Sequence, residues 1–279
     1  MPGIDYEKEY DNRGRVKEHP EIFARWAADA KAYREAGWAR DAKLDVSYGA
    51  SARQTYDLFP ATSGGDMPLV MFIHGGYWRS LEPAMFSHVA RGLNARGFAV
   101  ALPGYDLCPH VSVATIIEQM RAATLALWRA HNKRIVLTGH SAGGHLAACL
   151  LTQDWKAHGA PADLTMAAYA ISGVFDLTPL INVSQNADLK LTAQEAHKVS
   201  PLFWPAPRGK IFDAAVGGAE SSEFLRQSRI IADDWRERGV LTRYEEIAGA
   251  NHFTAVDPLA DPGSAMVARI AAMAGRIPV

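Results

Sequence analysis

The middle of the chain contains the sequence Gly139-His140-Ser141-Ala142-Gly143, which matches the pattern G-x-S-x-G. A predicted strand over 134–138 leads into it, and an apolar helical pattern begins at Ala142. A serine at a sharp turn from strand to helix needs small neighbours, because the backbone passes close to other elements while the hydroxyl projects from the sheet edge. This context predicts that Ser141 is a nucleophile, with the N–H groups of the following helix beside it.

Short apolar runs alternate with longer helical patterns on both sides of this turn, which predicts an α/β fold with a mostly parallel, eight-stranded sheet flanked by helices. The expected strands are 44–48, 53–59, 69–73, 98–102, 135–138, 166–171, 211–216 and 241–247. The first two are expected to form an antiparallel hairpin at a sheet edge. The expected helices are 20–37, 82–96, 113–131, 142–156, 223–238 and 263–275.

The chain has 279 residues, 48% of them hydrophobic, which predicts a single domain over 1–279. Two segments lie outside the alternation of strands and helices. Residues 1–43 are expected to form an N-terminal helical extension, and residues 176–207 a loop-rich insertion with four prolines. Because long irregular segments in compact domains are often functional, we expect the insertion to act as a lid.

The sequence His74-Gly75-Gly76-Tyr77-Trp78 directly follows the predicted strand 69–73. It resembles the H-G-G-x loop of lipases and esterases, whose backbone N–H groups bind the oxyanion of the tetrahedral intermediate. The resemblance implies that the amides of Gly76 and Tyr77, together with that of Ala142, form an oxyanion hole.

A general base is expected on the loop after the last strand, since enzymes with this serine turn carry their residues in the order serine, acid, histidine. Of ten histidines, His252 alone occupies that position, shortly after the predicted strand 241–247. His140 and His145 flank the serine in sequence, but neither is placed to take its proton, and both are expected to pack or to line the pocket.

The acid should follow the last strand but one. Glu220 is the first carboxylate after the predicted strand 211–216, and we favour it. Glu223 is the competitor, although a glutamate in the first turn of a helix is expected to act as a cap. Asp257 is a third and weaker choice, because it follows the base and would reverse the usual order.

These motifs together resemble the arylformamidase (kynurenine formamidase) and esterase branch of the α/β-hydrolases, over about residues 44–253. The resemblance implies the α/β-hydrolase fold and hydrolysis of N-formylkynurenine or small esters. One departure is the acid, which is usually aspartate in that branch, whereas Glu220 is present here. Glutamate also serves as the acid in enzymes of this fold.

We therefore expect a serine hydrolase that acts through an acyl-enzyme and needs neither a metal nor an organic cofactor. Aromatic residues near the motifs are expected to line an aryl-accepting pocket, although each could equally belong to the core. These residues are Tyr77, Trp78, Phe175, Trp204 and Phe253.

The chain carries 29 basic and 30 acidic residues, a balance that predicts no nucleic-acid partner and no membrane association. The expected partner is a small-molecule ester or amide, and the expected location is the cytoplasm. Three alternatives stay open: a carboxylesterase of short-acyl or aryl esters, acyl transfer to an acceptor other than water, and a non-catalytic ligand-binding protein on the same fold. The sequence also leaves a homo-oligomer open.

Overall fold

The computed structural model describes residues 3–36, 41–61 and 67–276 and contains one eight-stranded sheet. Its strands are β1 (Lys43–Ser47), β2 (Thr55–Phe59), β3 (Leu69–Ile73), β4 (Val100–Pro103), β5 (Ile135–His140), β6 (Ala167–Ile171), β7 (Ile211–Gly217) and β8 (Leu241–Ile247). They are arranged in the order β1-β2-β4-β3-β5-β6-β7-β8. The last six strands are parallel, and β1 and β2 pair antiparallel at one edge, which confirms the predicted fold class.

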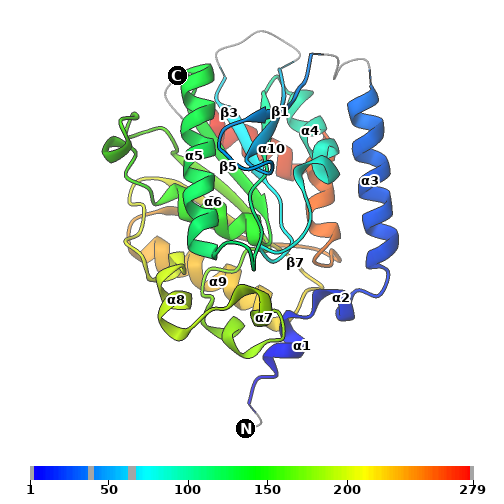
Figure 1. The fold of residues 1–279 in the computed structure, drawn as a ribbon, viewed down its shortest axis with the longest axis vertical. Coiled ribbons are helices and arrows are strands. Elements are labelled where there is room, and N and C mark those ends of the chain that lie inside the picture. Colours follow the sequence, from blue (N-terminus) through cyan, green and yellow to red (C-terminus); the bar gives the residue numbers. More distant parts are fainter. Residues whose placement is uncertain (1–2, 37–40, 62–66, 277–279) are drawn as a thin grey trace.

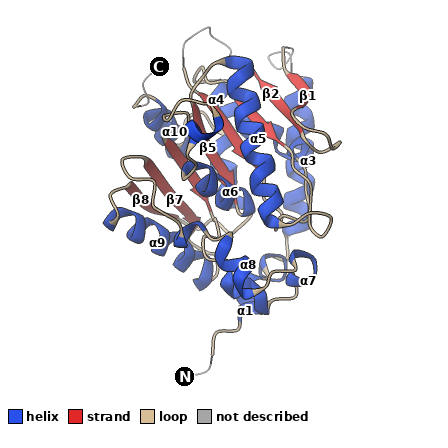
Figure 2. Cartoon of the chain, turned by 60° about the vertical axis from the view of Figure 1, so that its left-hand side comes forward, coloured by secondary structure: helices blue, strands red, loops and turns tan. Residues whose placement is uncertain are grey.

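Helices cover both faces of the sheet (Figures 1 and 2). One layer contains α3 (His19–Glu35), α4 (Ala90–Asn94) and α10 (Ala265–Ala274), and the other contains α5 (Val113–His131), α6 (Ala142–Leu151) and α9 (Ser222–Glu237). The packing on both faces of β3 explains why its sequence is apolar throughout. Met71 and Ile73 pack into the layer of α5 and α6, while Val70 and Phe72 pack into the opposite layer. Side chains alternate between the faces of a strand, so a strand covered on both sides buries every residue.

Several predicted helices differ in detail from the observed ones. The helix expected over 82–96 is a 3₁₀ helix, η2 (Pro83–Val89), followed by α4. The helix expected over 142–156 ends at Leu151 and is followed by η3 (Trp155–His158), whose first turn is capped by Asp154. The helix expected over 20–37 corresponds to α3, and residue 37 lies outside the described residues. Within the described ranges, no helix combines the length and apolar character that crossing a membrane requires.

The insertion consists largely of short helical turns instead of the expected loop. Its elements are η4 (Thr178–Asn182), α7 (Asn186–Leu189), α8 (Ala193–Lys198) and η5 (Pro201–Phe203). Helix α8 begins with a capping box, in which the Thr192 side chain accepts from the Glu195 N–H and the Glu195 side chain accepts from the Thr192 N–H.

The N-terminal extension begins with α1 (Tyr6–Tyr10) and α2 (Asn12–Arg15), and α1 lies beside the insertion and α9 (Figure 1). Glu7 accepts hydrogen bonds from the backbone and hydroxyl of Ser184, both at 2.6 Å. The Tyr10 hydroxyl donates to Glu223 at 2.9 Å, and the Tyr10 carbonyl accepts from the Tyr77 hydroxyl at 2.7 Å. The extension therefore passes over the carboxyl ends of β3 and β7.

Helix α6 approaches the end of β3 so closely that no side chain fits between them at Gly143. A Cβ atom placed on Gly143 would lie 1.9 Å from the carbonyl oxygen of Ile73 and 2.8 Å from that of His74. These neighbours are backbone atoms and cannot rotate away. Glycine at this position therefore fixes the distance between the helix and the sheet.

We expect Gly143→Ala to lower the free energy of unfolding by about 2 kcal/mol or more, because the added methyl group forces the helix and sheet apart. Chemical denaturation followed by circular dichroism measures this change. The matched control is Gly275→Ala at the end of α10, where the nearest atom to an added Cβ is 3.7 Å away. The control should be neutral or slightly stabilising. Equal stabilities for the two variants would contradict the packing argument.

Candidate active site

Ser141 lies between β5 and α6 in a backbone conformation that serine rarely adopts, with φ 56° and ψ −118°. Such a conformation costs about 1–3 kcal/mol and persists only when its surroundings enforce it. Here the Ser141 N–H donates to the Ile171 carbonyl at 2.8 Å, and Gly143 packs against β3. The turn is thus held in place by two neighbouring strands.

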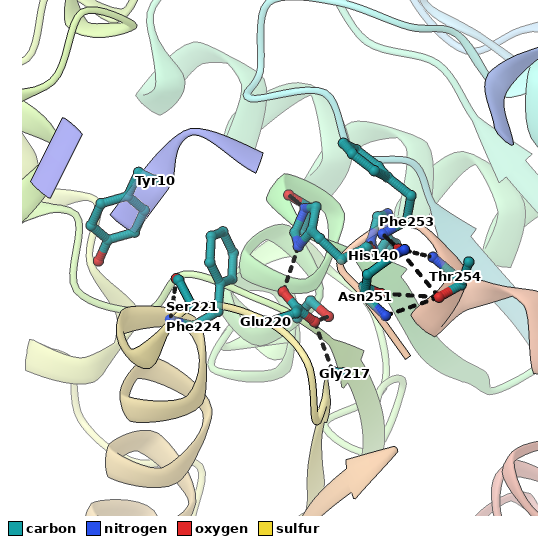
Figure 3. Close-up of polar contacts among 12 residues, drawn as sticks. Tyr10, His140, Gly217, Glu220, Ser221, Phe224, Asn251, Phe253 and Thr254 are labelled. Carbon is teal, nitrogen blue, oxygen red and sulfur yellow. Dashed lines mark hydrogen bonds and ion pairs between the residues drawn. The ribbon is translucent and has the colours of Figure 1, made fainter. Parts of the chain in front are cut away.

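Three side chains form a continuous hydrogen-bonded row at this turn, and Figure 3 shows the part of it around Glu220. His252 Nε2 lies 3.1 Å from Ser141 Oγ, and His252 Nδ1 lies 2.6 Å from Glu220 Oε2. The other oxygen of Glu220 accepts from the Ser172 hydroxyl at 2.5 Å and from the Gly217 N–H at 2.7 Å. Because a carboxylate accepts at Nδ1, the neutral imidazole presents its Nε2 lone pair to the serine hydroxyl.

The other two carboxylates considered for the acid are engaged elsewhere. Glu223 forms a two-fold ion pair with Arg226, at 2.7 and 2.8 Å, and accepts from Tyr10. Asp257 accepts from Arg25 at 2.7 Å and from the Trp26 indole at 3.1 Å. Of the three, the structure brings Glu220 to His252.

The loop that carries His252 is held by its neighbours on both sides (Figure 3). Asn251 Oδ1 accepts from the N–H groups of Phe253 at 3.0 Å and Thr254 at 2.9 Å. The His252 carbonyl lies 2.7 Å from His140 Nε2, and the ring of Phe224 lies 4.6 Å from the His252 ring. These contacts fix the position of the imidazole before any ligand binds.

The loop after β3 turns sharply at Gly76 and Tyr77, which have φ values of 109° and 51°. Burial keeps the pKa of Tyr77 well above its usual value, so its hydroxyl stays protonated and donates to the Tyr10 carbonyl. Within the described ranges, the N–H groups of Gly76, Tyr77 and Ala142 make no hydrogen bond to the protein. The three expected oxyanion donors are therefore available to a ligand.

A cavity of about 110 Å³ lies above Ser141 and His252. Five aromatic side chains contribute to its wall: Tyr10, Phe23, Trp26, Tyr77 and Phe253. Tyr77 and Phe253 were expected there from the sequence, whereas the other three come from the N-terminal extension. Phe23 links this group, since its ring lies 5.1 Å from that of Trp26 and 5.0 Å from that of Phe253.

Three residues expected in the pocket lie elsewhere. Trp78 is fully buried and packs edge-on against His145, with ring centroids 5.0 Å apart. Phe175 is also fully buried, and its ring packs against that of Phe212. Trp204 is half-buried in the insertion, where its indole donates to the Lys198 carbonyl at 2.9 Å. Trp78 and Phe175 thus take the core positions that the sequence had left open for them, and Trp204 packs along the insertion.

The insertion also contributes less to the cavity than expected, since Gln185 is its lining residue there. The extension takes this place, since its residues Tyr10, Asp11, Asn12 and Arg13 line the cavity. Sequence reasoning further missed Ser172, which directly follows β6 and supports Glu220. Its position at the carboxyl end of a parallel strand is a signal that could have identified it.

Among the residues that the structure describes, no group of three or more His, Cys, Asp or Glu side chains is arranged to hold a metal ion.

Comparisons with known proteins agree with this fold. Residues 70–274 match the family described as alpha/beta hydrolase fold. Kynurenine formamidase from Salmo salar is 30% identical over 232 residues, covering 78% of this chain and 77% of that protein. Kynurenine formamidase from Danio rerio is 29% identical over 242 residues, covering 84% of this chain and 82% of that protein.

Solved structures agree as well. A crystal structure from Silicibacter sp. TM1040, described as a candidate thioesterase, is 34% identical with a TM-score of 0.84, and the alignment covers 96% of this chain and 100% of that one. The carboxylesterase EstE1, from a metagenomic library, shares the fold with 17% identity, a TM-score of 0.72 and coverage of 95% and 98%. The chain belongs to the alpha/beta hydrolase fold family, in the branch that includes kynurenine formamidases and esterases.

Proposed function

We propose that the chain is a serine hydrolase that cleaves small aryl formamides or esters through an acyl-enzyme. The observation that carries this proposal is the row from Ser141 through His252 to Glu220, with hydrogen bonds of 3.1 and 2.6 Å, at the floor of an aromatic cavity. A nucleophile, a base and an orienting acid in this arrangement are the requirements for acyl transfer.

In the first half of the proposed reaction, Ser141 Oγ attacks the carbonyl carbon of the substrate while its proton passes to His252 Nε2. Glu220 stabilises the resulting imidazolium, and the N–H groups of Gly76, Tyr77 and Ala142 bind the oxyanion. The bond between the carbonyl carbon and the nitrogen or oxygen of the leaving group then breaks. His252 returns the proton to the departing amine or alcohol.

In the second half, water attacks the acyl-enzyme and gives its proton to His252. The bond to Ser141 Oγ breaks, the serine regains a proton from His252, and the carboxylic acid leaves. Attack by an alcohol or amine in place of water would give acyl transfer, and product analysis distinguishes the two.

The substrate class is supported by the cavity and by the relatives. Aromatic walls favour an aryl group, and the small volume favours a short acyl group such as formyl. The relatives named kynurenine formamidase match most of the chain, which favours the formamide. The cytoplasmic location and the absence of a nucleic-acid or membrane partner stay predictions from the sequence.

Replacing the nucleophile tests the enzyme assignment against the alternative of a ligand-binding protein. We expect Ser141→Ala to lower kcat by at least about 10⁴-fold and to abolish labelling by a fluorophosphonate probe. Ser47→Ala, at an exposed serine in β1, should retain both activity and labelling. Labelling of Ser141→Ala to the level of the unmodified chain would exclude Ser141 as the nucleophile.

The two glutamates make a matched pair. Glu220→Gln removes the charge that orients His252, and we expect kcat to fall by about 10³- to 10⁴-fold. Glu223→Gln should lower the melting temperature through its lost ion pair with Arg226 while changing kcat little. Steady-state kinetics and thermal melts of both variants give the comparison. A larger loss of kcat in Glu223→Gln than in Glu220→Gln would identify Glu223, and not Glu220, as the acid.

The aryl preference can be tested at Phe23, a half-buried ring of the extension. We expect Phe23→Ala to lower kcat/KM for phenyl acetate by about tenfold relative to ethyl acetate, since the aryl group loses a packing partner. Phe203→Ala, at an exposed ring in the insertion, is the control and should leave this ratio unchanged. Equal losses for both esters in Phe23→Ala would show that the ring supports the fold and does not select the aryl group.

A further inference from the structure

We propose that His140 is a specificity-determining residue, which accepts a hydrogen bond from the N–H of a bound formamide and so favours amides over esters of the same shape. The inference rests on the proposed function, because it concerns the same cavity. The proposal adds a residue that distinguishes leaving groups by whether they carry an N–H beside the carbonyl.

The first step is the tautomer of His140. Its Nε2 lies 2.7 Å from the carbonyl oxygen of His252. A carbonyl oxygen can only accept, so Nε2 must carry the hydrogen and Nδ1 must carry the lone pair as long as the ring is neutral. Burial, and then the neighbouring His252, lower the pKa of His140 to about 3. The ring is therefore neutral from pH 5 to 8, and Nδ1 is an acceptor throughout this range.

The second step is access to Nδ1. The His140 residue is 3% exposed and lines the cavity together with Ser141 and His252. Nδ1 has no hydrogen-bond partner among the described residues, yet it is not sealed from solvent. His145 provides the contrast, since its Nε2 also binds a carbonyl, that of Val199, but its Nδ1 is sealed in the core. The open acceptor of His140 is thus a feature of the cavity.

The third step is the position of Nδ1 relative to the reacting groups. A Cβ placed on Gly75 would lie 3.4 Å from Nδ1 and 3.0 Å from the Cβ of Ser141. The acceptor is therefore next to both the serine turn and the loop after β3. The available N–H groups of Gly76, Tyr77 and Ala142 are donors, so Nδ1 adds the opposite polarity to this part of the site.

The chemical consequence differs between amides and esters. A secondary formamide carries an N–H beside its carbonyl, and this hydrogen can pair with Nδ1. The corresponding ester has an oxygen there, whose lone pairs would face the lone pair of Nδ1 and leave both groups without a partner. A buried acceptor that loses its donor is unfavourable, and the discrimination should amount to about 10- to 100-fold.

The test compares formanilide with phenyl formate, corrected for its spontaneous hydrolysis, in the full chain and in His140→Phe. We expect the variant to lower kcat/KM for formanilide about 10- to 100-fold more than for phenyl formate, so that the amide-to-ester ratio falls by this factor. Loss of the contact with the His252 carbonyl affects both substrates and cancels in the ratio. His145→Leu is the matched control and should leave the ratio unchanged.

Equal losses for both substrates would overturn the proposal and leave His140 as a support for the His252 loop. A second measurement needs no variant: the unmodified chain should lose activity toward N-methylformanilide, which lacks the N–H, and the same activity toward both formanilides would overturn the proposal. The amide-to-ester ratio should also stay constant from pH 5 to 8, and a fall toward pH 5 would contradict a neutral acceptor. Turnover of neither formanilide nor phenyl formate by the unmodified chain would instead overturn the proposed function.

Discussion

The close approach of Gly143 to the carbonyl of Ile73 is the constraint on which the rest of the site depends. It sets the first turn of α6 against the end of β3, so the serine and the loop after β3 share one small space. In the sheet, Ile73 is opposite Gly139, and His140 is opposite Ile171. A slip of one residue in either register would move a strand end by about 3.3 Å, more than the 3.1 Å that joins His252 to Ser141. The hydrogen-bonded row is thus a product of strand register and of one missing side chain.

The walls of the cavity have a different origin from its floor. Ser141, Glu220 and His252 follow β5, β7 and β8, whereas much of the aromatic wall comes from a segment that precedes the sheet. Tyr10 links the two parts, because its carbonyl accepts from Tyr77 and its hydroxyl donates to Glu223. Changes in the extension can therefore alter substrate selection while the sheet preserves the chemistry.

The accuracy of the sequence-based predictions follows this division. An apolar run buried on both faces is continuous, so the bounds of β3 agree with the prediction to the residue. The bounds of β8 agree as well, although this strand at the sheet edge alternates between exposed and partly buried residues. Chain order led to Glu220 because the ends of parallel strands meet at one edge. The pocket walls could not be predicted in this way. Trp78 follows the glycine pair, but positive φ values at Tyr77 and Trp78 turn its ring into the core, and no pattern of residue types reveals such angles.

The packing of the extension against the sheet could not be predicted from hydrophobic periodicity either. Helices α1 and α2 have five and four residues, too few for a 3.6-residue repeat to be visible. Their position depends on contacts with residues more than 200 positions away, such as that between Tyr10 and Glu223. Packing of this kind is decided by the assembled fold and not by local sequence.

Two neighbouring histidines in the site differ in what their ring nitrogens face, and this difference decides which of them can hold a proton. The rings of His140 and His252 lie 4.8 Å apart. His252 Nδ1 faces the Glu220 carboxylate, which stabilises a positive imidazole, whereas His140 Nε2 faces an uncharged carbonyl, which does so far less. In the proposed reaction, a proton taken from Ser141 therefore stays on His252, where it can reach the leaving group. His140 remains neutral beside it, and in our proposal its free nitrogen recognises the substrate.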